Sequence, residues 1–198
     1  MCDDRSKEKD IVEFGSYPFE EDGTIRPIKW MVLKQDGNKA LLLSAYGLDA
    51  KLYNEEFKDV TWETCALRRW LNEDFYNAAF TEDEKNRIIS TNVKNSDNPE
   101  YNTPGGNDTE DKVFLLSIDE AEQYLTEFER RLSPTPYAVK QGAAESYNDN
   151  SWWWLRSPGS HPYGAACVDA GGDIRGRNHI ALRVKYAVCP ALWIELES

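Results

Sequence analysis

The side chains best suited to zinc binding and nucleophilic catalysis gather near the C-terminal end of this sequence. Its only two histidines, His161 and His179, lie near Cys167 and Cys189. Imidazole and thiolate groups bind zinc, and a thiolate beside an imidazole can act as a nucleophile. Their spacing matches no zinc motif, however, and no third residue that would orient a Cys–His pair is identifiable. We therefore expect neither a metal site nor a catalytic pair, although Cys167 and Cys189 could form a disulfide in an extracellular protein.

A second candidate site is the polar loop 96–112, which is rich in the oxygen ligands that calcium prefers. The spacing of these side chains does not match an EF-hand, and no Glu-Pro-Asn or Gln-Pro-Asp calcium motif is present. We expect a solvated loop, no cofactor and, as the less favoured alternative, calcium bound by the side chains of Asp97, Asn107, Asp108, Glu110 and Asp111. The sequence also contains no glycine-rich phosphate loop, G-x-S-x-G or H-E-x-x-H motif, so it does not indicate an enzyme.

The composition is that of one folded, acidic domain. The chain has 198 residues, seven tryptophans and a net charge of −12. This charge makes nucleic acid an unfavourable partner. Residues 151–198 are nearly neutral, so the negative charge lies in the residues before them. No run of 18 apolar residues is present, and we expect no membrane span.

The N-terminal segment 1–10 is hydrophilic and is predicted to be a disordered tether before a single domain over 11–198. It begins Met1-Cys2-Asp3-Asp4, which is how a bacterial lipoprotein would begin if its signal peptide were replaced by a start methionine. The alternative is an ordinary disordered N-terminus. The expected locations are the cell surface, the extracellular space (with Cys2 as a possible lipid anchor) or a phage particle, and a cytoplasmic location is not excluded.

The periodicity of apolar residues predicts strands first, then helices, then strands again. Strands are expected at 11–14, 27–35 and 39–45, with a turn at Asp36-Gly37. Helices are expected after Thr61, from Thr81 to Ile89 and from Ser117 to Leu132. The last helix would bury one face made of Ile118, Ala121, Leu125, Phe128 and Leu132. Later strands are expected in WWWLRS, AACV, IALRV and ALWIEL, with a turn at Gly171-Gly172. This segregated order indicates an α+β domain.

Two features of the first late strand carry structural expectations. Alternation in a strand predicts that at least one ring of Trp152–Trp154 is buried and one faces outward. Arg156 is expected to bind carboxylates or carbonyl groups that brace the following loop, and a ligand-binding role is the alternative.

Seven motifs resemble an uncharacterised domain family common in gut bacteria and their phages. They are FGSYPF, PIKWMVL, ALLLSAYGLDAKLYNEE, TWETCALRRWLNEDFYNAAF, DKVFLLS, WWLRSPG and VCPALWI, and the likeness covers the chain from Ile11 to Leu196. The family usually ends V-R-P-A-L-W-I, whereas here Cys189 stands at the arginine position. Whatever that arginine braces is therefore in doubt in this chain.

The family resembles the C-type-lectin-like superfamily, in the form shared with formylglycine-generating enzymes. The resemblance implies paired N- and C-terminal strands, two main helices and a late antiparallel sheet that faces the ligand. It also extends to the variable proteins of diversity-generating retroelements, in which a reverse transcriptase randomises template adenines, so that AAC and AAT codons become nearly any NNC or NNT codon. The copper-binding cysteine motif of the enzyme branch has no match here.

Codons of the NNC and NNT type cannot encode Glu, Lys, Gln, Met or Trp, and the window 160–189 contains one such residue, Lys185. Diversification explains this deficit, and the ordinary composition of a glycine-rich sheet is the open alternative. Under diversification the scaffold positions are Trp153, Leu155, Arg156, Pro158, Gly159, Ala165, Val168, Gly172, Ile174, Val184, Val188, Pro190 and Trp193. The displayed positions are Ser160, His161, Pro162, Tyr163, Cys167, Asp169, Ala170, Asp173, Arg175, Arg177, Asn178, His179, Ala181, Arg183 and Tyr186.

The favoured hypothesis is a non-enzymatic module that binds an unknown protein or cell-surface ligand through residues 160–189. A rigid sheet suits this role because preorganisation limits the entropy lost on binding. The alternatives are an enzyme of the same fold, with its site between the late sheet and the 96–112 loop, and a structural surface domain.

Overall fold

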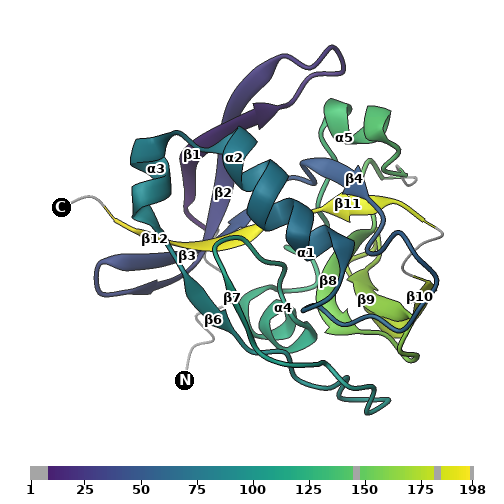
Figure 1. Cartoon of the computed structure of the whole chain (residues 1–198). Coiled ribbons are helices and arrows are strands. Elements are labelled where there is room, and N and C mark those ends of the chain that lie inside the picture. Colours follow the sequence, from purple (N-terminus) through teal and green to yellow (C-terminus); the bar gives the residue numbers. More distant parts are fainter. Residues whose placement is uncertain (1–8, 145–147, 181–183, 197–198) are drawn as a thin grey trace, which may run out of the picture.

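The computed structural model describes residues 9–144, 148–180 and 184–196, and for 178–180 it describes the backbone alone. These residues form two five-stranded sheets, a two-stranded ribbon and short helices (Figure 1). The structure is therefore α+β, as expected, with strands in the majority. Most of the predicted tether lies outside the described residues, and the first strand begins at Ile11. No helix in the described part of the chain has both the length and the apolar character needed to cross a bilayer.

The first sheet contains the N-terminal strands and the last strand, all antiparallel. A tight turn at Gly37, whose φ is +60°, joins the second and third strands at the predicted Asp-Gly turn. The last strand pairs with β3 and β5, so the expected pairing of terminal strands must be corrected: the β2–β3 hairpin separates β1 from β12. In sheet order the strands are β1 (Ile11–Pro18), β2 (Ile25–Asp36), β3 (Lys39–Ser44), β12 (Ala191–Glu195) and β5 (Ile88–Ile89).

The second sheet is the late sheet that the sequence predicts, completed by one early strand. Its β11 runs parallel to β8, and its other pairs are antiparallel. Of the strand predicted at IALRV, Ile180 is the last residue of β10, residues 181–183 lie outside the described residues, and Val184 is 41% exposed and not in a strand. In sheet order the strands are β10 (Ile174–Ile180), β9 (Gly164–Val168), β8 (Trp153–Pro158), β11 (Tyr186–Val188) and β4 (Asp49–Lys51).

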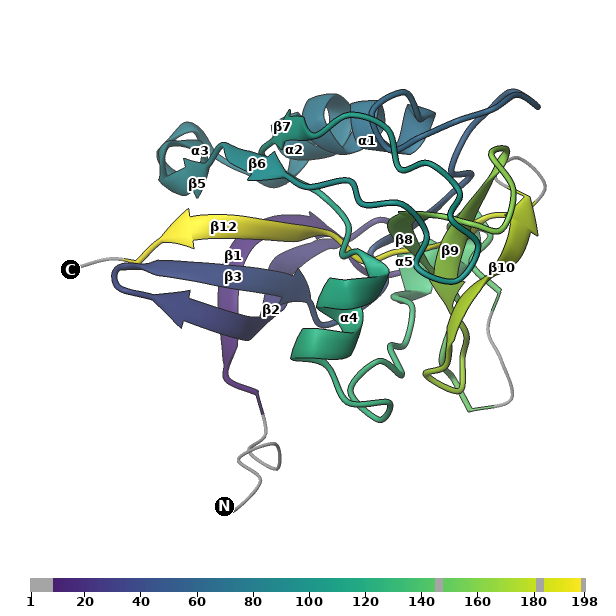
Figure 2. The same cartoon turned by 90° about the horizontal axis from the view of Figure 1, so that it is seen from below.

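The first helical segment consists of α1 (Ala66–Trp70), a π-helical stretch η1 (Leu71–Phe75) and α2 (Tyr76–Ala79). Its N-cap is Cys65, whose sulfur accepts a hydrogen bond from the backbone N–H of Arg68, so Thr61 is not the cap. Together with α3 (Glu82–Arg87), these helices cover one side of the first sheet (Figure 2). The predicted capping box of α3 is present.

The third helix, α4 (Ile118–Tyr124), has the predicted Ser117–Glu120 capping box but is shorter than expected. Its cap residue Leu125 is extended, and Phe128 is 75% exposed, so the predicted apolar helix face does not continue to Leu132. Leu125 and Leu132 are nevertheless buried, which explains why their spacing resembled a helix.

Two further elements complete the fold. The short helix α5 (Pro136–Gln141) follows the N-cap Thr135 and has proline at its first turn, a start signal that the sequence reading missed. Strands β6 (Thr91–Val93) and β7 (Thr109–Asp111) form the ribbon that holds the ends of the 96–112 loop together. The core packs between the first sheet and its helices and extends under β8 and β9, where both faces are buried.

Candidate ligand-binding surface

The candidate surface is built on the hairpin of β9 and β10 and on the turn that precedes it. Asp169 shapes the β9–β10 turn, because its Oδ1 accepts hydrogen bonds from the backbone N–H groups of Gly171 (2.8 Å) and Asp173 (3.0 Å). Gly172 has a φ of +89°, and a Cβ there would lie 2.1 Å from the carbonyl oxygen of Glu127. Only glycine fits this turn, as the predicted Gly-Gly signal implied.

Three arginines hold the same turn in place through hydrogen bonds and ion pairs. Arg130 and Arg131 donate from Nε to the carbonyl oxygens of Gly172 (2.7 Å) and Gly171 (2.8 Å). Arg175 binds the Asp169 carboxylate through Nε (2.8 Å) and Nη2 (2.6 Å) and reaches Asp173 at 3.1 Å. These two carboxylates raise the pKa of Arg175, mainly through the hydrogen bond to Asp169. The turn is therefore preorganised.

An aromatic cluster lies at the other end of the hairpin, at the turn between β8 and β9. The ring centroids of Tyr163 and His161 are 5.2 Å apart, and the ring of Phe57 lies 5.1 Å from Tyr163. The backbone N–H of Val60 donates to the carbonyl oxygen of Pro162 (2.8 Å), which attaches the Phe57 segment to this turn. Phe57 is 65% exposed. Exposed clusters of this kind commonly mark interaction sites.

The structure divides the predicted displayed positions into three groups. Partly or fully exposed side chains belong to Ser160, His161, Pro162, Tyr163, Ala170, Asp173, Arg175 and Arg177. Buried side chains, which cannot be displayed in this fold, belong to Cys167, Asp169 and Tyr186. Ala181 and Arg183 lie outside the described residues, as do the side chains of Asn178 and His179.

Each of the three buried positions corrects the prediction, and each is buried for its own structural reason. The β9 strand is covered on both faces, so Cys167 has no outward side. Tyr186 packs on Trp154 with ring centroids 4.5 Å apart, and burial raises its pKa to about 12. Asp169 is the turn anchor described above. Display of Cys167 and Tyr186 requires a solvated strand face, which β9 and β11 lack.

Most predicted scaffold positions are buried, including Trp153, Arg156, Pro158, Gly159 and Pro190, whereas Trp193 and Ile174 are half-buried and Val184 is exposed. The tryptophan run also needs correction. Trp153 and Trp154 are both fully buried, and their indole N–H groups donate to the carbonyl oxygens of Arg130 (3.0 Å) and Lys51 (2.9 Å). Trp152 is half-buried, so no ring of the three faces fully outward.

Arg156 binds a carboxylate and carbonyl groups, as expected, but these groups belong to Lys94, Leu115 and Glu120 and not to the loop that follows Arg156. Its guanidinium donates to both carboxylate oxygens of Glu120 and to the carbonyl oxygens of Leu115 (2.7 Å) and Lys94 (3.0 Å). The side chain is 3% exposed. It therefore joins β8 to α4 and to the segment after β6.

The metal sites considered from the sequence have no counterpart among the described residues. No group of three His, Cys, Asp or Glu side chains in this part of the chain could hold a metal ion. In the 96–112 loop, the Asp111 carboxylate accepts from Trp62 Nε1 (2.8 Å) and Arg68 Nε (2.6 Å), while Asp97 and Asp108 accept from backbone N–H groups. Asn98 packs this loop onto the sheet by donating to the Pro158 carbonyl (2.8 Å).

The buried cysteines Cys65, Cys167 and Cys189 are free thiols, so the suggested Cys167–Cys189 disulfide is not formed. Burial raises all three pKa values, that of Cys65 from 9.0 to about 12. A thiolate is the reactive form. We predict that a Cys2→Ser variant at pH 8 reacts with an aromatic disulfide reagent only as fast as it unfolds, as measured by absorbance with and without urea. Rapid stoichiometric reaction of the folded protein would contradict this burial.

The same shift has a consequence for stability. A raised pKa in the folded state means that the thiol stabilises the fold at pH values below 9 and that this contribution is lost as the pH rises from 9 toward 12.

Comparison with known protein families identifies a match over most of the chain. A family model described as Domain of unknown function (DUF6273) matches residues 37–196. No curated protein and no solved structure matches the chain.

Proposed function

The chain belongs to the family of the Domain of unknown function (DUF6273), and on this premise we propose that it is a ligand-binding display module with a C-type-lectin-like fold. The ligand is a protein or another cell-surface structure, contacted by the window 160–189. We also propose that this window is diversified, as in the variable protein of a retroelement, and that the protein acts at a cell surface, in the extracellular space or on a phage particle. An enzyme of the same fold remains the alternative.

The observation that carries the proposal is the combination of a rigid frame and exposed anchors within one window. Tyr163 and His161 form the exposed cluster with Phe57, while Arg175 and Arg177 are exposed on the edge strand β10. Tyrosine and arginine are among the residues that contribute most to binding energy at protein interfaces. The buried β8 and β9 strands beneath them are fixed by packing, so little conformational entropy is lost when a ligand binds.

The burial pattern limits which positions of the window 160–189 can vary if the window is diversified. Replacement of buried Cys167, Asp169 or Tyr186 by arbitrary residues would create cavities, overpacking or unpaired polar groups. These codons must then be constant or limited to side chains that fit. The exposed positions of the two turns and of β10 are less limited, although a change at Arg175 would remove its ion pairs with Asp169 and Asp173.

Sequencing of the genomic neighbourhood tests the proposal. We expect a near-repeat of the 3′ coding end that differs at template adenines, together with a reverse transcriptase gene. Related copies should differ at the codons of His161, Tyr163, Asp173, Arg175 and Arg177 and agree at Cys167 and Asp169. A locus without such a repeat, or with substitutions concentrated at the buried codons, would contradict the proposal. The unusual composition of the window would then be that of an ordinary glycine-rich sheet.

A further inference from the structure

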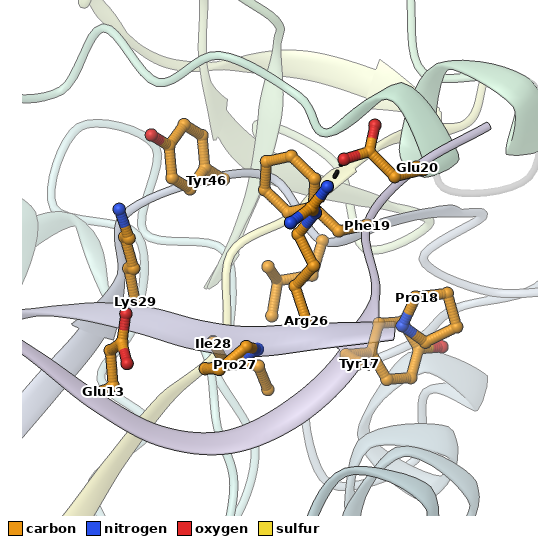
Figure 3. Close-up of a pocket in the computed structure, with 11 residues that line it drawn as sticks. Glu13, Tyr17, Pro18, Phe19, Glu20, Arg26, Pro27, Ile28, Lys29 and Tyr46 are labelled. Atoms are coloured by element: carbon orange, nitrogen blue, oxygen red, sulfur yellow. Dashed lines mark hydrogen bonds and ion pairs between the residues drawn. The ribbon is translucent and has the colours of Figure 1, made fainter. Parts of the chain in front are cut away.

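A separate cavity of about 400 Å³ lies at the first sheet, beside the end of the β1–β2 hairpin (Figure 3). Its size is within the range of small-molecule sites, and its lining is mainly apolar with a few charged groups, which is the usual composition of such sites. Most of its lining comes from residues 13–29, outside the matched domain at 37–196. The cavity is therefore a feature of the N-terminal hairpin of this chain, and it is independent of the surface proposed above.

The aromatic walls of the cavity are held in place. The rings of Phe19 and Tyr46 meet edge to face, with centroids 5.7 Å apart and planes at 88°. The backbone of Phe19 is fixed on both sides, since its N–H donates to Thr24 (2.9 Å) and its carbonyl accepts from Tyr137 (2.9 Å). Ile28 and Leu48, both 3% exposed, add aliphatic groups to the same lining. A flat apolar group would find preformed walls here.

Two cations, Lys29 and Arg26, belong to the cavity lining together with the carboxylates of Glu13 and Glu20. Lys29 and Arg26 project from β2 toward the side where the rings of Tyr46 and Phe19 lie (Figure 3). Arg26 donates from Nε to Glu20 (2.6 Å), which fixes the guanidinium and leaves its terminal nitrogens available to a ligand. Lys29 makes no ion pair with a described residue, although Glu13 is its partner across the β1–β2 ladder. Hydrogen-bond donors of positive charge thus face the cavity beside an apolar interior.

We propose that this cavity binds a carboxylate carried on a planar apolar group. The apolar group packs against Phe19 and Tyr46 over Ile28 and Leu48, and the carboxylate accepts hydrogen bonds from Lys29 and Arg26. Charge-assisted hydrogen bonds of this kind are the strong ones, and the guanidinium fork matches a carboxylate. The same chemistry is present in a free aromatic acid and in the C-terminal residue of a peptide that ends in phenylalanine.

Isothermal titration calorimetry with matched small molecules tests the proposal on the full chain. We expect 3-phenylpropionate to bind with a Kd on the order of millimolar, and its uncharged amide and acetate each to bind at least about tenfold more weakly. The peptide Gly-Gly-Phe and its C-terminal amide separate the two sources: tighter binding of this peptide than of phenylpropionate indicates a peptide end, and the reverse indicates a free acid. Equal binding of acid and amide would overturn the role of the cations.

A substitution in the cavity and a control outside it test whether the ligand binds at this cavity. Lys29→Met keeps the aliphatic stem and removes the charge, so it should weaken phenylpropionate binding about tenfold. Lys34→Met is the control, because Lys34 is an exposed lysine of the same strand outside the cavity. Its binding and the melting temperatures of both variants should match those of the unchanged protein. Absence of binding by every probe, or equal losses in the two variants, would refute the proposal.

Discussion

Replacing Arg156 with methionine is expected to lower the free energy of unfolding by about 3 kcal/mol, because breaking a buried ion pair leaves its partners unsatisfied. The guanidinium satisfies Glu120, the Leu115 carbonyl and the Lys94 carbonyl at once. Methionine matches much of the side-chain volume but offers no donor. Glu120 is 29% exposed and can recover some hydration, so we place the loss at the lower end of the range for broken buried pairs.

Urea denaturation followed by circular dichroism measures this loss. Arg175→Met is the matched control, since it removes the same charge from a side chain that is 48% exposed, and its cost should stay below about 1 kcal/mol. A double-mutant cycle with Glu120→Gln should show coupling between the two residues. If Arg156→Met costs no more than Arg175→Met, the bracing role inferred for Arg156 is wrong.

The elements with local signals could be predicted from the sequence. The capping boxes at Thr81 and Ser117 begin α3 and α4, because the cap and its glutamate lie three residues apart and interact whatever the tertiary context. The Gly37 and Gly172 turns need positive φ, which also depends on the residue alone. The end of α4 has no such signal: Leu125 is extended, a turn over 127–130 follows it, and Leu125 and Leu132 are both buried at a spacing that happens to match a helix.

The candidate surface could be predicted only in part, because exposure in a sheet depends on what covers each face. The diversification hypothesis predicts that Cys167 and Tyr186 are displayed, but neighbouring segments cover both sides of the strands there. Phe57 was missed entirely. Its place beside Tyr163 results from a contact between residues 106 positions apart in the chain, and a lone aromatic residue in NEEFKDV gives no sign of it.

The second large effect on stability is expected at Trp153, which belongs to the buried strand β8 beneath the exposed positions. This ring is fully buried, and its N–H donates to the Arg130 carbonyl at 3.0 Å. Trp153→Ala should therefore cost about 3–5 kcal/mol, through the lost burial, the cavity that remains and the unpaired carbonyl. For a chain of this size the melting temperature should fall by roughly 6–20 °C.

Tyr163→Ala is the control that makes the Trp153 result informative. It also deletes an aromatic ring, but one that is partly exposed at the turn and contacts Phe57 and His161. Its melting temperature, measured by differential scanning calorimetry, should fall by no more than about 4 °C, since partly exposed contacts contribute little to stability. Comparable losses in the two variants would mean that the turn supports the fold as much as the buried strand does. The window could then not vary without unfolding the domain, and its unusual composition would be a consequence of packing.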